Sequence, residues 1–515
     1  MPITKFEKDG FYYADKSYKS IVGLNPKKFT TSINFPPNTE IKQNTFENLE
    51  SNFFIASVFV PASCFINPLT FNTMSSSRNI QMGEITFEEG TEQLFDRTLF
   101  GSPFLSVNLP KSLKVLGKYC MANMPNLENI DLTNVEIIKE GTFEASGLKS
   151  VDILDSIKII EEDAFRDCRY LKNVFYNSSC NIPRGAFLAC LSLDNFKFGA
   201  QSKITEIGVQ AFNNTKLSSF DFIPSINKID SAAFANTDFE EVLIPPSMRY
   251  IRSDAFASCK KLTKFTISED GNPLMLYDNI LAYSSVKSLT IPKRAISLDE
   301  QTCAHMKKLE TLDIQAPVKE IPYMFAVDCV SLEFLALSPT VTLIDNHAFN
   351  GANIKNLNFE HVKHYIHKCF GETALEEFVV YDDVDFASNI FDSVKTVIAK
   401  NKKFNLFNFP TYRIQPDGLI ILNSEAANLS QNKEFLEDMS SENFKVIILQ
   451  DQEMNYLLSL DKIDRDSIID ILKEKNYDKI EDFIKDNNIT SFRKISVLNS
   501  LINSAKQNTY DQEVI

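Results

Sequence analysis

The sequence contains no tryptophan and only 15 glycines among its 515 residues. Enzymes of the Rossmann and P-loop classes depend on glycine-rich turns, and neither GxGxxG nor GxxxxGK[ST] occurs in the chain. The net charge of −15 argues against a general nucleic-acid binder, because phosphate contacts need clustered Lys and Arg. We therefore expect no enzymatic activity of these classes, no cofactor and no nucleic-acid partner.

Targeting signals are also missing from the sequence. The first twenty residues, MPITKFEKDGFYYADKSYKS, lack the basic start and apolar core of a signal peptide. The most apolar stretch, Phe53 to Leu69, is short for a membrane span and contains Pro61 and Pro68. These features predict no membrane span and a cytoplasmic protein, with exposure at the cell surface by non-classical export as the alternative. The nine cysteines, an odd number, favour free thiols.

What the chain does contain is an internal repeat. Phenylalanines, or residues in their place, recur at steps of 21 to 25 residues, and we call these the ladder positions. A unit of this length cannot bury its own apolar face, so the period predicts a solenoid of stacked coils. The sixteen predicted ladder positions are Phe46, Phe71, Phe95, Cys120, Phe143, Phe165, Phe187, Phe212, Phe234, Phe256, Leu281, Cys303, Phe325, Phe349, Phe370 and Phe391.

Each unit also carries a strand signal after the ladder position. In the unit of Phe143, Leu148, Val151 and Ile153 follow an L-x-x-V-x-I pattern. This alternation predicts a short strand with one buried face. An aliphatic residue stands five positions before the ladder residue, as Ile138 does before Phe143.

The combined pattern L-x-x-V-x-I-P, V-x-x-I and A-F-x-x-C-x-x-L resembles the BspA-like leucine-rich repeat, from about Thr31 to Asn401. The resemblance implies a β-rich, right-handed leucine-rich-repeat solenoid of the α/β repeat class. Members of that family are known or suspected as surface adhesins and interaction proteins, so the resemblance implies no catalysis.

The ends of the chain depart from the repeat. Residues 1–45 contain a predicted β-hairpin with a Lys-Asp-Gly turn, which we interpret as an N-terminal cap on a solenoid spanning 46–413. Residues 414–515 predict a small α/β, mostly helical domain with two buried strands, GLIILN and FKVIILQ, and then three amphipathic helices. From Pro416 to Ile515 there are 19 acidic and 11 basic residues, a net charge of −8. This acidic region is either a cap or a docking module.

Two groups of side chains could carry chemistry. Cys168, Cys190 and Cys259 each follow a ladder phenylalanine by three residues, and a nucleophile should not recur with the repeat. We expect them to be packing residues, with a Cys168–Cys190 disulfide as the alternative. The segment EHVKHYIHKC holds His361, His364, His367 and Cys369, residue types that can bind zinc. The repeat register places His364 away from the core, so we predict a solvated edge and no metal site.

The remaining candidate is the exposed side of the strands, on the expected concave face of the solenoid. If Val151 and Ile153 point inward, Ser150 and Asp152 point outward. Exposed aromatic residues in a polar field are typical of protein contact surfaces. The sequence thus predicts a non-catalytic protein–protein interaction scaffold, with a cell-surface or secreted adhesin as the alternative; the partner and the oligomeric state stay open. The predicted partner-binding residues are Asp152, Asn173, Phe175, Lys197, Asp221, Glu241, Leu243, Lys264, Asp313 and Phe334.

Overall fold

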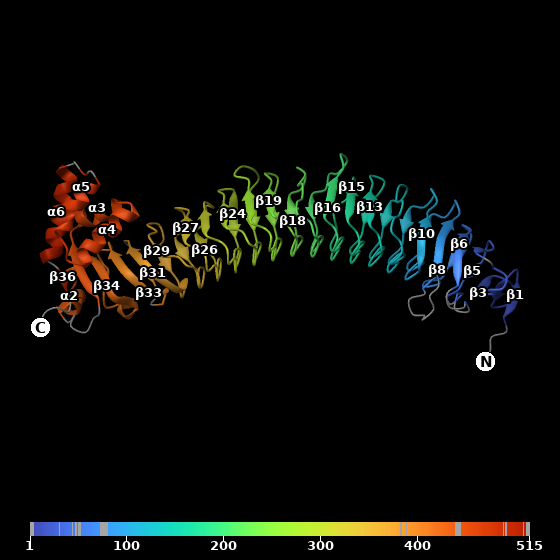
Figure 1. The fold of residues 1–515 in the computed structure, drawn as a ribbon, viewed down its shortest axis with the longest axis horizontal. Coiled ribbons are helices and arrows are strands. Elements are labelled where there is room, and N and C mark those ends of the chain that lie inside the picture. The colour runs from blue at the N-terminus through green and yellow to red at the C-terminus, as the bar shows by residue number, and fades with distance from the viewer. Residues whose placement is uncertain are drawn as a thin grey trace. The chain divides into compact units, whose positions relative to one another are not determined.

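The computed structural model describes residues 5–29, 31–43, 45–46, 49, 53–72, 81–381, 384–387, 389–437, 444–487, 489, 492–507 and 509–510. The chain divides into two compact units, Met1–Val286 (unit 1) and Lys287–Ile515 (unit 2). Each unit contains a stack of parallel β-coils, which confirms the predicted β-solenoid (Figure 1).

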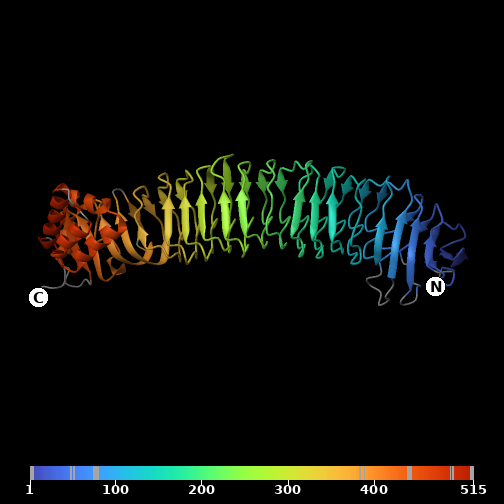
Figure 2. The ribbon, with the colours of Figure 1, turned by 45° about the horizontal axis from the view of Figure 1, so that its top comes forward.

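The coils of unit 1 build two rows of parallel strands, although some coils lack the strand of one row (Figure 2). The longer strands form the long-strand ladder: β4 (Ser32–Asn34), β6 (Phe54–Val60), β8 (Gln81–Phe87), β10 (Phe104–Asn108), β13 (Ser150–Ile153), β15 (Asn173–Tyr176), β16 (Asn195–Phe198), β19 (Glu241–Ile244) and β21 (Lys264–Ile267). The shorter strands form the short-strand ladder: β5 (Glu40–Ile41), β7 (Phe65–Ile66), β9 (Gln93–Leu94), β11 (Val115–Leu116), β12 (Ile137–Ile138), β14 (Ile159–Ile160), β17 (Glu206–Ile207), β18 (Lys228–Ile229), β20 (Tyr250–Ile251) and β22 (Leu274–Leu276).

The predicted N-terminal hairpin is present. Strands β1 (Phe6–Lys8) and β2 (Phe11–Tyr13) pair antiparallel around a turn in which Asp9 and Gly10 have positive φ. Strand β3 (Ser20–Leu24) pairs antiparallel with β2 on one side and parallel with β5 on the other. The hairpin therefore extends the short-strand ladder at its N-terminal edge.

The phenylalanines form a continuous buried column in unit 1. Successive rings from Phe143 through Phe165, Phe187, Phe212 and Phe234 to Phe256 have centroids 5.2–5.5 Å apart and planes within 11° of parallel. Burial of each ring contributes about 1.5–3 kcal/mol by area. This column is thus a principal source of stability for the unit.

Two predicted ladder positions in unit 1 are wrong. Phe95 is 48% exposed, and Leu99, five residues after the buried Leu94, takes the ladder position of that coil. Cys120 is buried but lies one residue before the ladder position, which Met121 holds. Each ladder N–H donates to the carbonyl just before the next ladder residue, as Phe143 N does to Ala164 O. Leu99 N donates in the same way to Cys120 O, and Met121 N to Thr142 O. Phe71 and Leu99 are 28 residues apart, more than the steps of 21 to 25 used for the prediction, which therefore selected the wrong phenylalanine.

Left-handed residues flank the ladder position on both sides. Asp163 and Asp167 have φ of 57° and 55° around Phe165, and Asp254 and Ser258 both have φ of 60° around Phe256. The segment between them stacks through backbone bonds between coils, such as Phe165 N to Ala186 O at 2.9 Å. This repeated double turn was not predicted from the sequence.

Unit 2 has the same two rows of strands. Its long strands are β23 (Ser288–Ile291), β25 (Thr311–Ile314) and β27 (Phe334–Leu337), and its short strands are β24 (Ala295–Leu298), β26 (Glu320–Ile321), β28 (Leu343–Ile344), β30 (His364–Tyr365) and β32 (Asp385–Phe386). The predicted ladder position Phe325 is also wrong, because Phe325 is buried but lies one residue before the ladder position of its coil. The ladder position is Ala326, whose N–H donates to Ala348 O just before Phe349.

A six-stranded sheet then leads into the C-terminal region. Its order is β29 (Asn356–Leu357), β31 (Phe370–Val380), β33 (Phe391–Ala399), β34 (Ile414–Asn423), β35 (Lys445–Leu449) and β36 (Thr509–Tyr510). The two strands predicted from GLIILN and FKVIILQ are confirmed as β34 and β35. The domain boundary at 413/414 stays a prediction, and the strands on its two sides, β33 and β34, pair in parallel.

Helices complete this region, as predicted. The three expected helices are α4 (Lys462–Lys473), α5 (Lys479–Asp486) and α6 (Phe492–Gln507), whereas α1 (Ser424–Ala427), α2 (Ser430–Glu437), α3 (Asp451–Ser459) and the short 3-10 helix η1 (Thr411–Arg413) were not predicted. A buried core joins α3–α6 to the sheet through residues such as Ile447, Met454, Ile468 and Leu501. Residues 511–515 of the predicted domain lie outside the described residues.

Candidate functional site

The exposed side of the long-strand ladder is built by the alternation of buried and exposed side chains along the short strands. In β13, Val151 and Ile153 are buried while Asp152 between them is exposed. All the predicted partner-binding residues of unit 1 are exposed: Asp152, Asn173, Phe175, Lys197, Asp221, Glu241, Leu243 and Lys264. Asp221 differs from the others in lying outside a strand.

Parallel pairing brings these residues into rows. Asp152, Phe175 and Lys197 are register partners across β13, β15 and β16. In the neighbouring row, Asn195 Nδ2 donates to Asn173 Oδ1 at 2.9 Å. Such cross-strand bonds fix the orientation of the side chains before any partner arrives, which lowers the entropy lost on binding.

Apolar side chains interrupt this polar surface. Phe175 is 39% exposed and Leu243 is 63% exposed, and Leu243 lies beside the exposed pair Lys264–Glu241, whose Nζ–Oε2 distance is 3.1 Å. The ion pair is solvated and adds little stability. The apolar groups lose hydration on contact with a partner, so they are the anchors that this surface offers.

In unit 2 the two predicted partner-binding residues, Asp313 and Phe334, differ in how exposed their side chains are. Phe334 is 66% exposed on β27. Asp313 on β25 is only half-buried, and its Oδ2 accepts a hydrogen bond from Gln315 Nε2 at 2.7 Å. Phe334 is therefore the more accessible of the two.

A hollow that the sequence did not indicate lies on this surface in unit 1. Residues 127–133 form no strand between β10 and β13, although Leu127, Ile130 and Leu132 carry the strand pattern. The hollow measures about 480 Å³, and polar side chains from three coils line it: Ser106, Asn108, Asn129, Asp131, Ser150 and Asp152. Of these six residues, only Asp152 was a predicted partner-binding residue, and Ser150 was expected to point outward beside it. Extending the outward offsets one coil toward the N-terminus would also have selected Asn129 and Asp131.

Asp131 is held in place within this hollow. Thr133 donates to Asp131 Oδ1 from both its N–H and its hydroxyl. These two hydrogen bonds lower the pKa of the Asp131 carboxyl below its usual value. The hollow thus presents an ionised carboxylate at neutral pH.

A known family of repeat proteins matches the sequence of this solenoid. A family model described as "BspA type Leucine rich repeat region" matches residues 66–172, 172–277 and 274–397 in six copies. The matched span is more than half of the chain. The protein belongs to the BspA-type leucine-rich-repeat family.

Three solved structures resemble this BspA-type protein. They are a leucine-rich repeat protein from Eubacterium ventriosum (16% identity, 58% of this chain and 83% of that chain, TM-score 0.41), one from Bacteroides ovatus (16%, 86% and 98%, TM-score 0.38) and the pneumococcal vaccine antigen PcpA (14%, 87% and 99%, TM-score 0.34). No curated protein matches the sequence. Within the described residues, no helix combines the length and the apolar character that crossing a bilayer requires.

The cysteines of the BspA-type repeat are part of its packing. All nine cysteines are free, so the alternative of a Cys168–Cys190 disulfide is not realised. Each thiol after a ladder phenylalanine donates to the carbonyl of the preceding ladder residue: Cys168 to Phe143 O at 3.0 Å, Cys190 to Phe165 O at 3.1 Å and Cys259 to Phe234 O at 3.3 Å. Burial raises the pKa of Cys168 to about 12 and that of Cys259 to about 11. These thiols are therefore protonated and unreactive.

The histidine segment does not come together as a ligand set. His361, His364 and His367 are exposed, whereas Cys369 is buried. The ring of His367 packs instead against His347, with centroids 5.7 Å apart. Over the parts of the chain that the structure describes, no three His, Cys, Asp or Glu side chains are grouped closely enough to hold a metal ion.

Proposed function

We propose that this protein is a non-catalytic scaffold that binds a protein partner on the exposed side of its long-strand ladder. The observation that carries the proposal is the placement of Phe175 and Leu243, both exposed, within rows of ordered polar side chains. Apolar anchors surrounded by polar groups are the arrangement that protein contact surfaces use. Membership of a repeat family supports the same conclusion, because solenoids expose extended binding surfaces.

The size of an ordinary interface indicates how much of the ladder is used. Adjacent strands lie about 4.8 Å apart, so the coils from β13 to β21 span roughly 24 Å. A standard interface buries about 800 Å² on each partner, which is more than strands of four residues offer over that length. We infer that a partner also contacts neighbouring coils, including the hollow lined by Asn129 and Asp131.

Partner recovery with surface variants of the full chain tests this proposal. The double variant Phe175→Ala/Leu243→Ala removes both anchors, and we expect it to lower partner recovery by about tenfold or more, as the loss of interface hot spots does. Ile159→Ala is the matched control, because Ile159 is exposed on the short-strand ladder of the same unit. Equal recovery of the partner by the double variant and the wild type would contradict the assignment of this face.

The location of the protein is a separate proposal. The cytoplasmic location predicted above and the adhesin alternative use the same face on different partners. Surface labelling of intact and permeabilised cells separates them, because an adhesin is labelled in intact cells and a cytoplasmic scaffold only after permeabilisation.

A further inference from the structure

The hollow on the long-strand face is acidic. Asp131 and Asp152 line this hollow of about 480 Å³, and none of the described residues that line it is a lysine or an arginine. Thr133 occupies only Oδ1 of Asp131, and the Asp152 carboxylate has no hydrogen-bond or ion-pair partner among the described residues. Both carboxylates therefore keep acceptor atoms for a ligand.

Basic residues are missing from the strands around the hollow. Strands β8, β10, β13 and β15 and residues 127–133 contain no lysine or arginine. Lys149, which precedes β13, already pairs with Glu128, and the Nζ–Oε1 distance is 2.6 Å. The negative charge of Asp131 and Asp152 is thus left for a partner to balance.

An exposed aromatic ring lies beside the acidic pair. Phe175 is the register partner of Asp152 across β13 and β15, and its side chain is 39% exposed. Because neighbouring strands lie about 4.8 Å apart, a group bound to the Asp152 carboxylate is within reach of the Phe175 ring. Carboxylates and the faces of aromatic rings both attract cations. Together these neighbours select a positively charged group, and they would repel an anion.

Among positively charged side chains, arginine matches this arrangement. Its guanidinium group is flat and carries five N–H donors, so it hydrogen-bonds to two carboxylates while one of its faces lies on a ring. The ammonium group of lysine is a compact, strongly hydrated charge without a flat face. Arginine is also enriched among the residues that contribute most to the affinity of protein interfaces.

We propose that the hollow receives an arginine side chain of the protein partner, whose guanidinium group hydrogen-bonds to Asp131 and Asp152 and lies on the ring of Phe175. This inference rests on the proposed function, and it names the chemistry of the partner at that face. The hollow has the volume of sites that hold small molecules, about 300–1,000 Å³, so it has room for one side chain. Docking removes water from the hollow, and the attraction between guanidinium and carboxylates grows as water leaves.

Short peptides that differ in one type of residue are the probes for this site. Each alternates serine with arginine, lysine or citrulline and carries the same uncharged dye, and fluorescence anisotropy measures its binding to the full chain. Citrulline has nearly the shape of arginine but no charge. We expect the arginine peptide to bind with a Kd below about 0.1 mM, the lysine peptide to bind several times more weakly and the citrulline peptide at least about tenfold more weakly.

Variants of the hollow test the assigned residues. Asp131→Asn/Asp152→Asn keeps the size of both side chains and removes their charges. It should weaken binding of the arginine peptide about tenfold or more and leave binding of the citrulline peptide unchanged. Phe175→Leu keeps an apolar side chain but removes the ring, and it should weaken binding of the arginine peptide about threefold.

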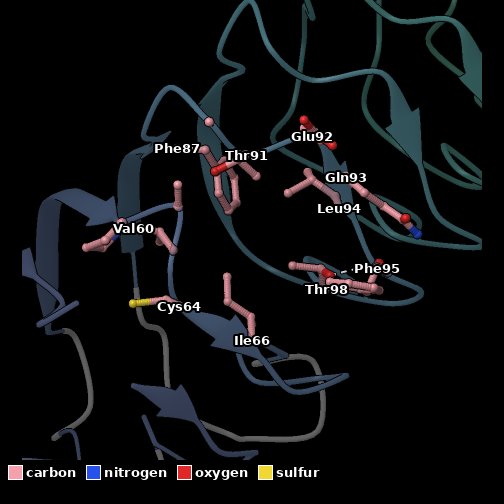
Figure 3. Close-up of a pocket in the computed structure, with 13 residues that line it drawn as sticks. Val60, Cys64, Ile66, Phe87, Thr91, Glu92, Gln93, Leu94, Phe95 and Thr98 are labelled. Atoms are coloured by element: carbon pink, nitrogen blue, oxygen red, sulfur yellow. Dashed lines mark hydrogen bonds between the residues drawn. The ribbon is translucent and has the colours of Figure 1, made fainter. Parts of the chain in front are cut away.

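A second cavity of unit 1 supplies the matched control. It measures about 320 Å³, lies between the coils of Val60 and Leu94, and has the single carboxylate of Glu92 among its described lining residues (Figure 3). Glu92→Gln/Glu162→Gln removes two exposed carboxylates near the short strands β9 and β14, so it changes the net charge as much as the double variant of the hollow. Binding of the arginine peptide should stay within about twofold of the wild type, because physiological salt screens charges outside the hollow.

Two outcomes overturn the proposal: equal binding of the arginine and citrulline peptides, or equal weakening by the hollow variant and the control. Recovery of the partner separates this inference from the proposed function. Loss of recovery in Phe175→Ala/Leu243→Ala with normal recovery in Asp131→Asn/Asp152→Asn retains the binding face and overturns only the arginine site. Loss of recovery in both variants supports both, and normal recovery in both overturns both.

Discussion

At the scale of single residues, the cysteines show how one position serves the repeat in several coils. The thiol of Cys168 reaches back one coil to Phe143 O, and Cys190 and Cys259 make the same contact in their own coils. In another coil, a threonine takes the place of the cysteine three residues after the ladder position. This residue, Thr237, donates to Phe234 O of its own coil at 2.9 Å. The charged neighbours that distinguish the cysteine segments, such as Arg169 and Lys260, are exposed and take no part in these bonds.

Thiol reactivity tests this interpretation. Cys64 and Cys180 are half-buried, and the other seven cysteines are buried. We expect N-ethylmaleimide to modify only Cys64 and Cys180 in the native protein, because burial keeps the other thiols both inaccessible and protonated. All nine should react in denaturant. Mass spectrometry of peptides from native and denatured samples gives the pattern, and rapid native modification of Cys168 would contradict it.

The left-handed turns lead to a second prediction. Ala232 precedes the ladder residue Phe234 by two positions with φ of 53°, and Gly141 holds the same place before Phe143 with φ of 58°. Ala232→Gly should raise stability by up to about 1 kcal/mol, because glycine adopts this conformation without strain. Gly141→Ala should destabilise by about 1–3 kcal/mol, since its Cβ would lie 2.2 Å from Tyr119 Cε1. Thermal midpoints of the two variants should shift in opposite directions, and a shared sign would refute the equivalence of the two positions.

At the scale of the element, the strand pattern identified most long strands and failed where backbone geometry decides. The alternation around Val151 and Phe265 predicted β13 and β21, because one buried face needs period two. The same pattern at Leu127, Ile130 and Leu132 gave no strand, since pairing depends on where adjacent coils run. The same period of two predicted correctly that Asp152 and Phe175 lie on the exposed face. The cavity of about 320 Å³ between the coils of Val60 and Leu94 could not be predicted, because it depends on how two coils separate.

Besides the apolar core, one buried ion pair joins α4 to the sheet. Arg465 Nε and Nη2 each lie 2.9 Å from a carboxylate oxygen of Glu377 on β31, and both side chains are buried. Arg465→Leu leaves the Glu377 carboxylate buried without a cation, so we expect a loss of about 3–5 kcal/mol. Replacing both partners by leucine should recover most of that loss, because well-packed apolar residues often substitute for a buried pair.

Urea unfolding combined with amide hydrogen exchange in α4 measures this effect locally. Protection in α4 should fall in Arg465→Leu and return in the double variant. Lys462→Ala is the matched control, because the contact between Lys462 and Glu376, 3.3 Å long, is exposed and should contribute under about 1 kcal/mol. A double variant as unstable as Arg465→Leu would show that the pair contributes net stability.

At the scale of the whole molecule, each coil contacts mainly its neighbours, which makes the coils exchangeable. Phe143 stacks on Phe165, and Phe165 on Phe187, with nearly the same spacing and orientation. β13, β15 and β16 likewise share one register, Val151 to Val174 to Phe196. Stability in such an array is approximately a sum of coil and nearest-neighbour terms. Loss of one complete coil should then leave both new neighbours well matched.

Deletion of residues 160–181 tests this exchangeability, because Ile182 then follows Ile159 in the place of Ile160 and brings Phe187 onto Phe143. We expect the shortened protein to keep its circular dichroism spectrum and to unfold cooperatively, with a modest loss of stability equal to one coil and one interface. Deletion of residues 160–180 differs by a single residue and places Asn181 in the buried position. That shift of one residue exchanges buried and exposed side chains in a strand, so it should lower the thermal midpoint far more. If both deletions cost the same, contacts beyond the nearest neighbours must hold the array together.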